Sequence, residues 1–198
     1  MPNVSDWRVC PSSPRTIRSA HSSPAPQPWQ QSKTSQALIA RRQTDPVFTA
    51  ETSLDFDPAS FQNLAGLILY YNASKFHYLF VSRDEHVGKY LGIMSCQADF
   101  SLETVYPLGN SKIPLPDGVA IRLRMQVDHE QLRFSWSIGD EGWQELPVVL
   151  DVRYLTDQAG QEEGEQFTGT FIGLCAHDLT GQRTPADFDY LAVRPGKG

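Results

Sequence analysis

The sequence predicts an all-β protein in which two antiparallel β-sheets pack face to face as a sandwich. Three observations predict this fold: segments that alternate apolar and polar residues, segments that are apolar throughout, and turn-forming residues between them. No segment has a convincing helical period. At 198 residues, the chain is long enough for one domain with a sizeable hydrophobic core.

The alternating segments indicate strands that place one face on a core and the other face in water. In residues 48–56 the even positions are mostly apolar and the odd positions are polar. The same period of two runs through residues 119–127 and 132–138. Alternation of this kind is typical of antiparallel sheets, because only one face of each strand is buried.

The segments that are apolar throughout suit strands inside a sandwich. With the alternating segments and residues 187–193, they bring the prediction to at least eight strands at short spacing. The apolar segments are residues 64–71, 76–81, 90–94 and 170–176, and the turns that separate strands are residues 72–74, 87–89, 114–118 and 139–142.

Residues 1–35 differ in composition from the rest of the chain. Ser, Pro, Gln and Arg dominate this segment, which therefore buries too little apolar surface to offset the entropy lost on ordering. We predict a disordered or atypical lead-in over residues 1–35, followed by one β-sandwich accessory domain over residues 36–195.

The net charge of −6 is unevenly distributed. The first 42 residues contain six basic residues and one acidic residue, so they carry +5 and the remainder carries −11. A domain this acidic predicts no nucleic-acid partner and no membrane-surface binding, because both need a basic face. No run of 18 apolar residues and no signal-peptide pattern is present, so we expect a cytoplasmic protein unless upstream sequence directs export.

The three cysteines, Cys10, Cys96 and Cys175, do not form the even set that a disulfide framework needs. Since Cys96 and Cys175 lie in apolar segments, we expect both to be buried free thiols. No HExxH motif or CxxC pair occurs, so we predict no metal site and no cofactor.

The carboxylates do not stand out as a catalytic pair. Glycoside hydrolysis usually needs two carboxyl groups that flank the scissile bond. Residues 84–85 and 162–163 lie in polar loops and suit solvated surface. Asp187 and Asp189 share a strand face, where three roles are open: cation binding, solvent exposure, or an ion pair with Arg183. We therefore predict no catalytic residue on this chain.

A sugar-binding surface needs an exposed aromatic side chain on which a pyranose ring can stack. Trp143, which follows a turn, and His177, where a strand meets a loop, are the candidate sugar contacts. Trp136 is in phase with the apolar positions of residues 132–138 and is expected in the core. A structural role is the favoured interpretation for both histidines, and the alternative for His77 is that it faces outward.

The most promising functional segment is the loop TDQAGQEEGEQ at residues 156–166. A long polar loop in a compact domain often carries function. The loop ends at Phe167, for which two interpretations remain open. Phe167 is either the first core residue of the next strand or a side chain that projects into a neighbouring domain.

Six segments carry a family resemblance when their order and spacing are taken together: residues 48–52, 65–72, 134–137, 149–151, 167–181 and 185–190. Across residues 36–193 the chain resembles the C-terminal domain of family 43 glycoside hydrolases, the β-xylosidases. The resemblance implies a concanavalin A-like jelly roll that packs on a five-bladed propeller. The propeller, absent from this sequence, would carry the catalytic carboxylates.

The resemblance also implies a role for one aromatic side chain. In the family, a phenylalanine from this loop region reaches toward the substrate pocket of the propeller and helps to close it. Phe167 matches that position best, and Phe171 is the runner-up. The chain would then contact xylooligosaccharides only through the propeller and would hydrolyse nothing alone. Two alternatives stay open: a free-standing lectin-like sandwich that binds xylan-type sugars, and a protein-interaction module of laminin-G-like shape.

Overall fold

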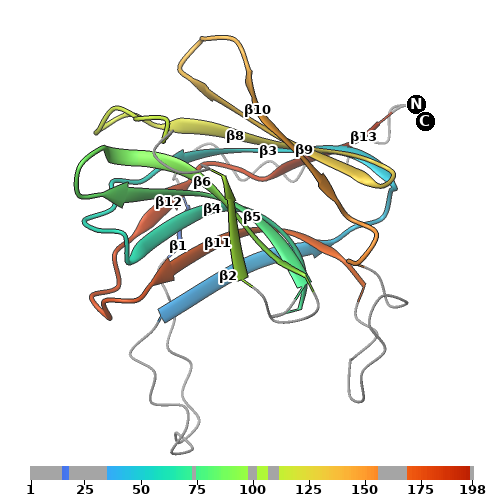
Figure 1. The fold of residues 1–198 in the computed structure, drawn as a ribbon, viewed down its shortest axis with the longest axis horizontal. Helices are drawn as coiled ribbons and strands as arrows, with labels where there is room; N and C mark the ends of the chain where they lie inside the picture. Colours follow the sequence, from blue (N-terminus) through green and yellow to red (C-terminus); the bar gives the residue numbers. More distant parts are fainter. Residues whose placement is uncertain are drawn as a thin grey trace, which may run out of the picture.

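The structure is a computed structural model that describes residues 15–17, 35–72, 75–97, 102–106, 112–155 and 169–196. Within the described residues there is no helix, and thirteen strands form two sheets that lie in two layers (Figure 1). The predicted all-β sandwich is therefore confirmed. The strands are β1 (Arg15–Ile17), β2 (Ser35–Arg42), β3 (Val47–Asp55), β4 (Asn63–Asn72), β5 (Lys75–Asp84), β6 (Gly88–Gln97), β7 (Leu102–Tyr106), β8 (Ile121–Asp128), β9 (Gln131–Ile138), β10 (Gln144–Asp151), β11 (Phe171–Asp178), β12 (Ala186–Phe188) and β13 (Ala192–Pro195).

Every strand pair is antiparallel. The seven-stranded sheet has the order β1-β12-β3-β8-β9-β10, with β13 paired to β3. The six-stranded sheet has the order β2-β11-β4-β5-β6-β7. In Figure 1 strands β3, β8, β9 and β10 of the seven-stranded sheet lie above strands β2, β4, β5 and β11 of the six-stranded sheet.

The alternating segments form strands as predicted. In β3 and β8 the apolar positions are buried, whereas most of the polar positions between them are half-buried or exposed. β8 begins at Ile121, two residues later than the alternation predicts. The reason is that the backbone of Gly118 and Val119 binds Asp57 and Lys89 instead of pairing with a neighbouring strand.

The main hydrophobic core lies between the inner faces of the two sheets. Trp136 belongs to this core and is 6% exposed, which confirms its predicted place. Cys96 and Cys175 are buried free thiols, also as predicted, and Cys10 lies outside the described residues. A second, smaller cluster lies on the outer face of the six-stranded sheet.

The predicted lead-in over residues 1–35 falls largely outside the described residues. The described part, β1, pairs with β12 at the edge of the seven-stranded sheet. β2 begins at Ser35 and is an edge strand of the six-stranded sheet. The boundary at residue 36 remains a prediction.

Candidate functional site

The candidate site is the end of the sandwich at which residues 156–168 connect β10 to β11. We call this end the loop end and define it by residues 152–155, which follow β10, and residues 169–170, which precede β11. The loop of residues 156–166 and Phe167 lie outside the described residues. What the structure describes is the base that supports this loop.

The base is built around a buried histidine. His77 on β5 is fully buried, so it does not face outward. Its Nδ1 lies 2.7 Å from the Ser95 hydroxyl, and its Nε2 lies 3.0 Å from the Asp151 carbonyl oxygen. The Tyr154 hydroxyl lies 2.6 Å from the same Nε2. His77 therefore has the structural role that the sequence analysis favoured.

The protonation state of His77 follows from these partners. A backbone carbonyl only accepts hydrogen bonds, so Nε2 carries the proton and Nδ1 accepts from the Ser95 hydroxyl. Burial lowers the pKa of His77 to about 4, because desolvation disfavours the imidazolium. The ring is thus neutral at neutral pH, and it joins β5 and β6 to the segment that leads into the loop.

The two ends of the loop are tied to each other. Leu155, the last described residue before the loop, is buried, and its NH donates to the Val152 carbonyl at 3.0 Å. The Thr170 hydroxyl donates to the Leu155 carbonyl at 2.5 Å. The Thr170 carbonyl in turn accepts from the Gln43 NH at 2.8 Å. A loop that leaves from a fixed base can present a side chain at a defined place.

A shallow depression of about 220 Å³ lies beside this base. Arg153 donates to Asp151 at 2.6 Å and lies 3.8 Å from Glu130. Its hydrogen bonds lower the pKa of Asp151, so that carboxyl group is ionised at neutral pH. It is unsuited to donate the proton that glycoside hydrolysis needs. The lining residues are Glu130, Gln131, Val149, Leu150, Asp151 and Arg153.

Phe171, the runner-up for the pocket role, is the first residue of β11. It pairs with Tyr70 across the six-stranded sheet and is half-buried. The Arg42 guanidinium lies 5.7 Å from the centre of its ring. Phe171 is therefore packed against its own sheet at the loop end.

The two candidate sugar contacts lie away from the loop end and on different sheets. Trp143 precedes β10 and is half-buried. The Arg124 guanidinium lies 3.6 Å from the centre of a Trp143 ring, and that of Arg122 lies 5.2 Å away. These arginines occupy ring surface on which a sugar would otherwise stack.

His177 lies near the end of β11, opposite the loop end. Its Nε2 is 3.1 Å from the Cys175 sulfur, and its ring centre is 5.7 Å from that of Tyr78. Burial lowers the pKa of His177, so the neutral form is favoured. These contacts fit a structural histidine, and sugar binding by Trp143 or His177 stays a prediction.

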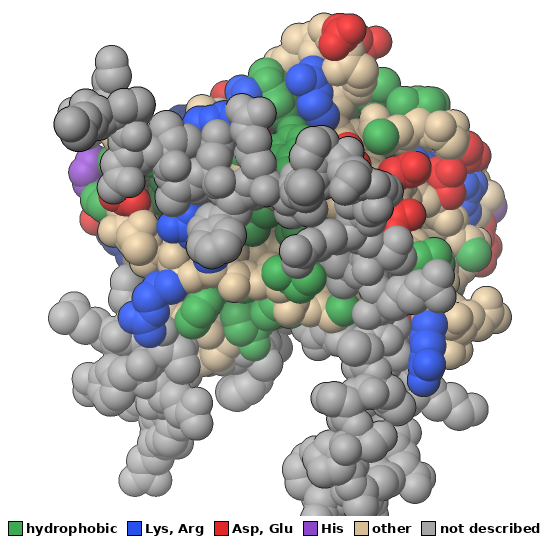
Figure 2. All heavy atoms as spheres, turned by 180° about the vertical axis from the view of Figure 1, so that it is seen from behind, with side chains coloured by type: hydrophobic (Ala, Val, Ile, Leu, Met, Phe, Trp, Pro, Cys, Tyr) green, Lys and Arg blue, Asp and Glu red, His purple; other side chains and the backbone are tan. Residues whose placement is uncertain are grey.

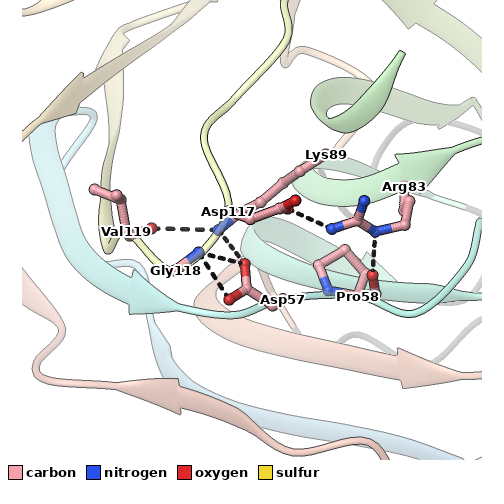
Figure 3. A network of polar contacts seen from close by, with 7 residues as sticks. All are labelled: Asp57, Pro58, Arg83, Lys89, Asp117, Gly118 and Val119. Atoms are coloured by element: carbon pink, nitrogen blue, oxygen red, sulfur yellow. Dashed lines mark hydrogen bonds and ion pairs between the residues drawn. The ribbon is translucent and has the colours of Figure 1, made fainter. Parts of the chain in front are cut away.

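A second polar network, around the buried Lys89, lies at the end of the sandwich opposite the loop end (Figure 3). The Lys89 ammonium is fully buried and donates to Asp57 at 2.9 Å and to the Val119 carbonyl at 3.2 Å. Asp57 also accepts from the Gly118 NH at 2.9 Å. The network therefore fixes the loops that precede β4 and β8. Beside it, Figure 3 shows a second set of linked residues: Arg83, Pro58 and Asp117.

The partners in these two networks could not be predicted, because they are distant in sequence. Lys89 lies in the predicted turn of residues 87–89, and His77 lies in a predicted core strand. His77 is two positions from Leu79, so the period of two places both on one face.

Among the described residues, no group of three or more His, Cys, Asp or Glu side chains could hold a metal ion. Asp187 and Asp189 thus belong to no such group within that part of the chain. The described part also contains no helix long and apolar enough to cross a membrane.

Comparison with known proteins agrees with this architecture. Residues 24–194 match the family described as the β-xylosidase C-terminal concanavalin A-like domain. The xylosidase/arabinosidase 43B of Humicola insolens is 38% identical over 168 residues, which are 81% of this chain and 30% of that enzyme. The β-xylosidase of Bacillus subtilis is 36% identical over 160 residues, 80% of this chain and 29% of that enzyme.

A solved structure of a xylosidase is also similar to this chain. The xylan β-1,4-xylosidase of Bacillus halodurans is 35% identical, with a TM-score of 0.74 over 81% of this chain and 30% of that one. The fold and the sequence together define a concanavalin A-like β-sandwich domain. The chain belongs to the family of β-xylosidase C-terminal domains of glycoside hydrolase family 43. It spans about 30% of the length of the relatives it matches.

Proposed function

We propose that this chain is a non-catalytic domain that packs on the five-bladed catalytic propeller of a β-xylosidase and helps to close its xylooligosaccharide pocket. The observation that carries the proposal is the match over residues 24–194 to a domain that is C-terminal in β-xylosidases. The fixed base at the loop end supports it, because Tyr154 and Thr170 anchor both ends of the loop.

Within this proposal, Phe167 reaches the partner's pocket and forms part of its wall. An apolar wall excludes water and strengthens electrostatic interactions near the catalytic carboxylates. It also limits how many sugar units the pocket holds, which favours the release of single xyloses from chain ends. Phe171 is less suited to this role, because its ring already lies beside the Arg42 guanidinium.

The proposal assigns all proton transfer to the partner. Among the described carboxylates, Asp151 and Asp57 have lowered pKa values and bind basic side chains. A general acid of a glycosidase instead needs a raised pKa. The purified chain is therefore expected to leave nitrophenyl xylosides intact.

The test is a chimera in which residues 24–198 replace the matching C-terminal region of the Bacillus subtilis β-xylosidase. We expect the chimera to hydrolyse xylobiose, and Phe167→Ala to lower kcat/KM by about tenfold, which corresponds to about 1.4 kcal/mol. Val87→Ala removes an exposed side chain in the turn between β5 and β6 and serves as the control. Equal kcat/KM for all three proteins would contradict the pocket role. Calorimetry of the free chain with xylobiose tests the lectin-like alternative, which requires binding.

A further inference from the structure

β2 is an edge strand of the six-stranded sheet, and no described strand pairs with its outer edge. Its eight residues, Ser35–Arg42, pair with β11 in one uninterrupted register. An edge strand of this kind presents a row of backbone NH and carbonyl groups to any strand that approaches it. Figure 1 shows β2 along the lower rim of the molecule.

The strands at the other three ends of the two sheets are protected against pairing. β1 has only three residues, and β10 contains Pro147 and a register shift between Glu145 and Val149. β7 has five residues, and its pairing with β6 is irregular between Ile93 and Met94. Short strands, prolines and bulges keep an edge strand from pairing with other molecules. β2 has none of these features, so it is the sheet end, among those described, that is open to pairing.

The centre of β2 is apolar and exposed on both faces of the sheet. Leu38 is 37% exposed and Ile39 is 49% exposed. Leu38 lies opposite Cys175 of the outer cluster and Ile39 lies opposite Leu174 of the main core, so the two side chains are on different faces. Figure 2 shows hydrophobic side chains along the same lower rim, and the acidic side chains that it shows lie mostly in the upper half. A strand that pairs with β2 would cover apolar surface on both faces.

The charges of β2 indicate which strand fits. Residues 35–40 are uncharged, and Arg41 and Arg42 follow at the end of the strand that pairs with Phe171. When two copies of β2 pair antiparallel about a two-fold axis, the arginines of each copy meet the uncharged start of the other. A parallel alignment would instead place the arginines of both copies side by side, which is unfavourable. The apolar centre meets the same centre of the other copy, so β2 is complementary to itself.

We infer that β2 pairs with β2 of a second copy of this chain, so that two six-stranded sheets join into one continuous sheet across a two-fold axis. The inference is independent of the proposed function. Backbone hydrogen bonds along the paired edges supply the affinity, and Leu38 and Ile39 add apolar contact, one on each face. One strand pair is a small interface, so we expect a reversible dimer whose population depends on concentration.

The first test is the mass of the assembly in solution. Sedimentation equilibrium of the 198-residue chain covers the range from low micromolar to near-millimolar concentration. We expect the mass to rise from one chain to two and no further, because the two-fold pairing occupies the free edge of both copies. A mass of one chain at every concentration, as when another segment of the chain covers β2, would overturn the inference. A mass that rises beyond two chains would also overturn it, since it requires another surface.

A charge at the centre of β2 tests whether this edge forms the dimer. Leu38→Lys is expected to weaken the dimer severalfold, because the two-fold axis brings both copies of residue 38 close together and like charges across paired strands repel. Val149→Lys makes the same change at a 49% exposed position on β10 and is expected to leave the dimer unchanged. Equal weakening by both substitutions would contradict pairing through β2.

A mixture of Leu38→Lys and Leu38→Glu separates strand pairing from a change in folding. Each variant alone repels its own copy, whereas one chain of each kind can form an ion pair across the axis. We therefore expect the mixture to associate more tightly than either variant alone. If it associates no better, residue 38 does not lie at the axis and the inference is wrong. Circular dichroism checks that both variants keep the β-structure of the wild type.

Discussion

At the scale of single residues, the sandwich relies on two buried polar side chains, one near each end. His77 joins β5 and β6 to the base of the loop, and Lys89 fixes the loops at the opposite end. Buried polar groups are tolerated only when they are hydrogen-bonded. Each side chain has at least two partners, so each network specifies where neighbouring segments sit.

The His77 network predicts a pH dependence of stability. The pKa of His77 is about 4 in the folded state, below the ordinary value of 6.5. Between pH 4 and pH 6.5 the folded state therefore binds fewer protons than the unfolded state. The contribution of neutral His77 to the unfolding free energy is fully present above pH 6.5, and it falls by about 3 kcal/mol as the pH drops to 4. Urea unfolding of the wild type and of His77→Gln between pH 7 and 4 measures this. The variant is expected to show the weaker pH dependence, and parallel curves would contradict the assignment.

Lys89 predicts a second effect at this scale. Lys89→Met leaves the Val119 carbonyl without a donor and Asp57 without its ion pair, which is expected to lower the unfolding free energy by about 1–3 kcal/mol. Arg133→Met breaks the exposed pair with Glu145 and is expected to cost less than about 1 kcal/mol. Denaturant unfolding compares the two. Equal losses would show that burial of Lys89 is without consequence.

At the scale of elements, the close pairing of β4 and β5 depends on glycine. A Cβ at Gly66 would come within 2.0 Å of the Leu79 carbonyl oxygen on β5. Backbone atoms cannot move aside as the end of a flexible side chain can. β4 and β5 are the two central strands of the six-stranded sheet, so their spacing affects the whole sheet.

Gly66→Ala is therefore expected to destabilise the domain by about 3 kcal/mol, at the upper end for overpacking. Gly142→Ala is the matched change, because no atom lies within 4 Å of its added Cβ, and it is expected to stay within about 0.5 kcal/mol of the wild type. Thermal unfolding of both variants checks this. A neutral Gly66→Ala would mean that β4 and β5 are less closely joined.

At the scale of the whole molecule, two antiparallel sheets enclose one main hydrophobic core. The sequence predicted the sandwich because apolar and polar residues alternate along β3, β8 and β9, and in β3 and β8 this alternation follows the alternation in burial. It could not predict on which face of the sheet His77 lies, because β5 has apolar residues on both faces, so inner and outer positions cannot be told apart from the sequence. The start of β8 depends on contacts with Asp57, which is distant in sequence.

The central claim is that this domain acts by docking on a catalytic partner and neither hydrolyses nor binds sugar alone. Titration calorimetry of the 198-residue chain with the separately produced catalytic region of the Bacillus subtilis β-xylosidase tests it most directly. We expect one-to-one association with a negative heat-capacity change, since apolar surface is buried, and no heat of binding with xylobiose. Binding of xylobiose without any association with the catalytic region would contradict the account.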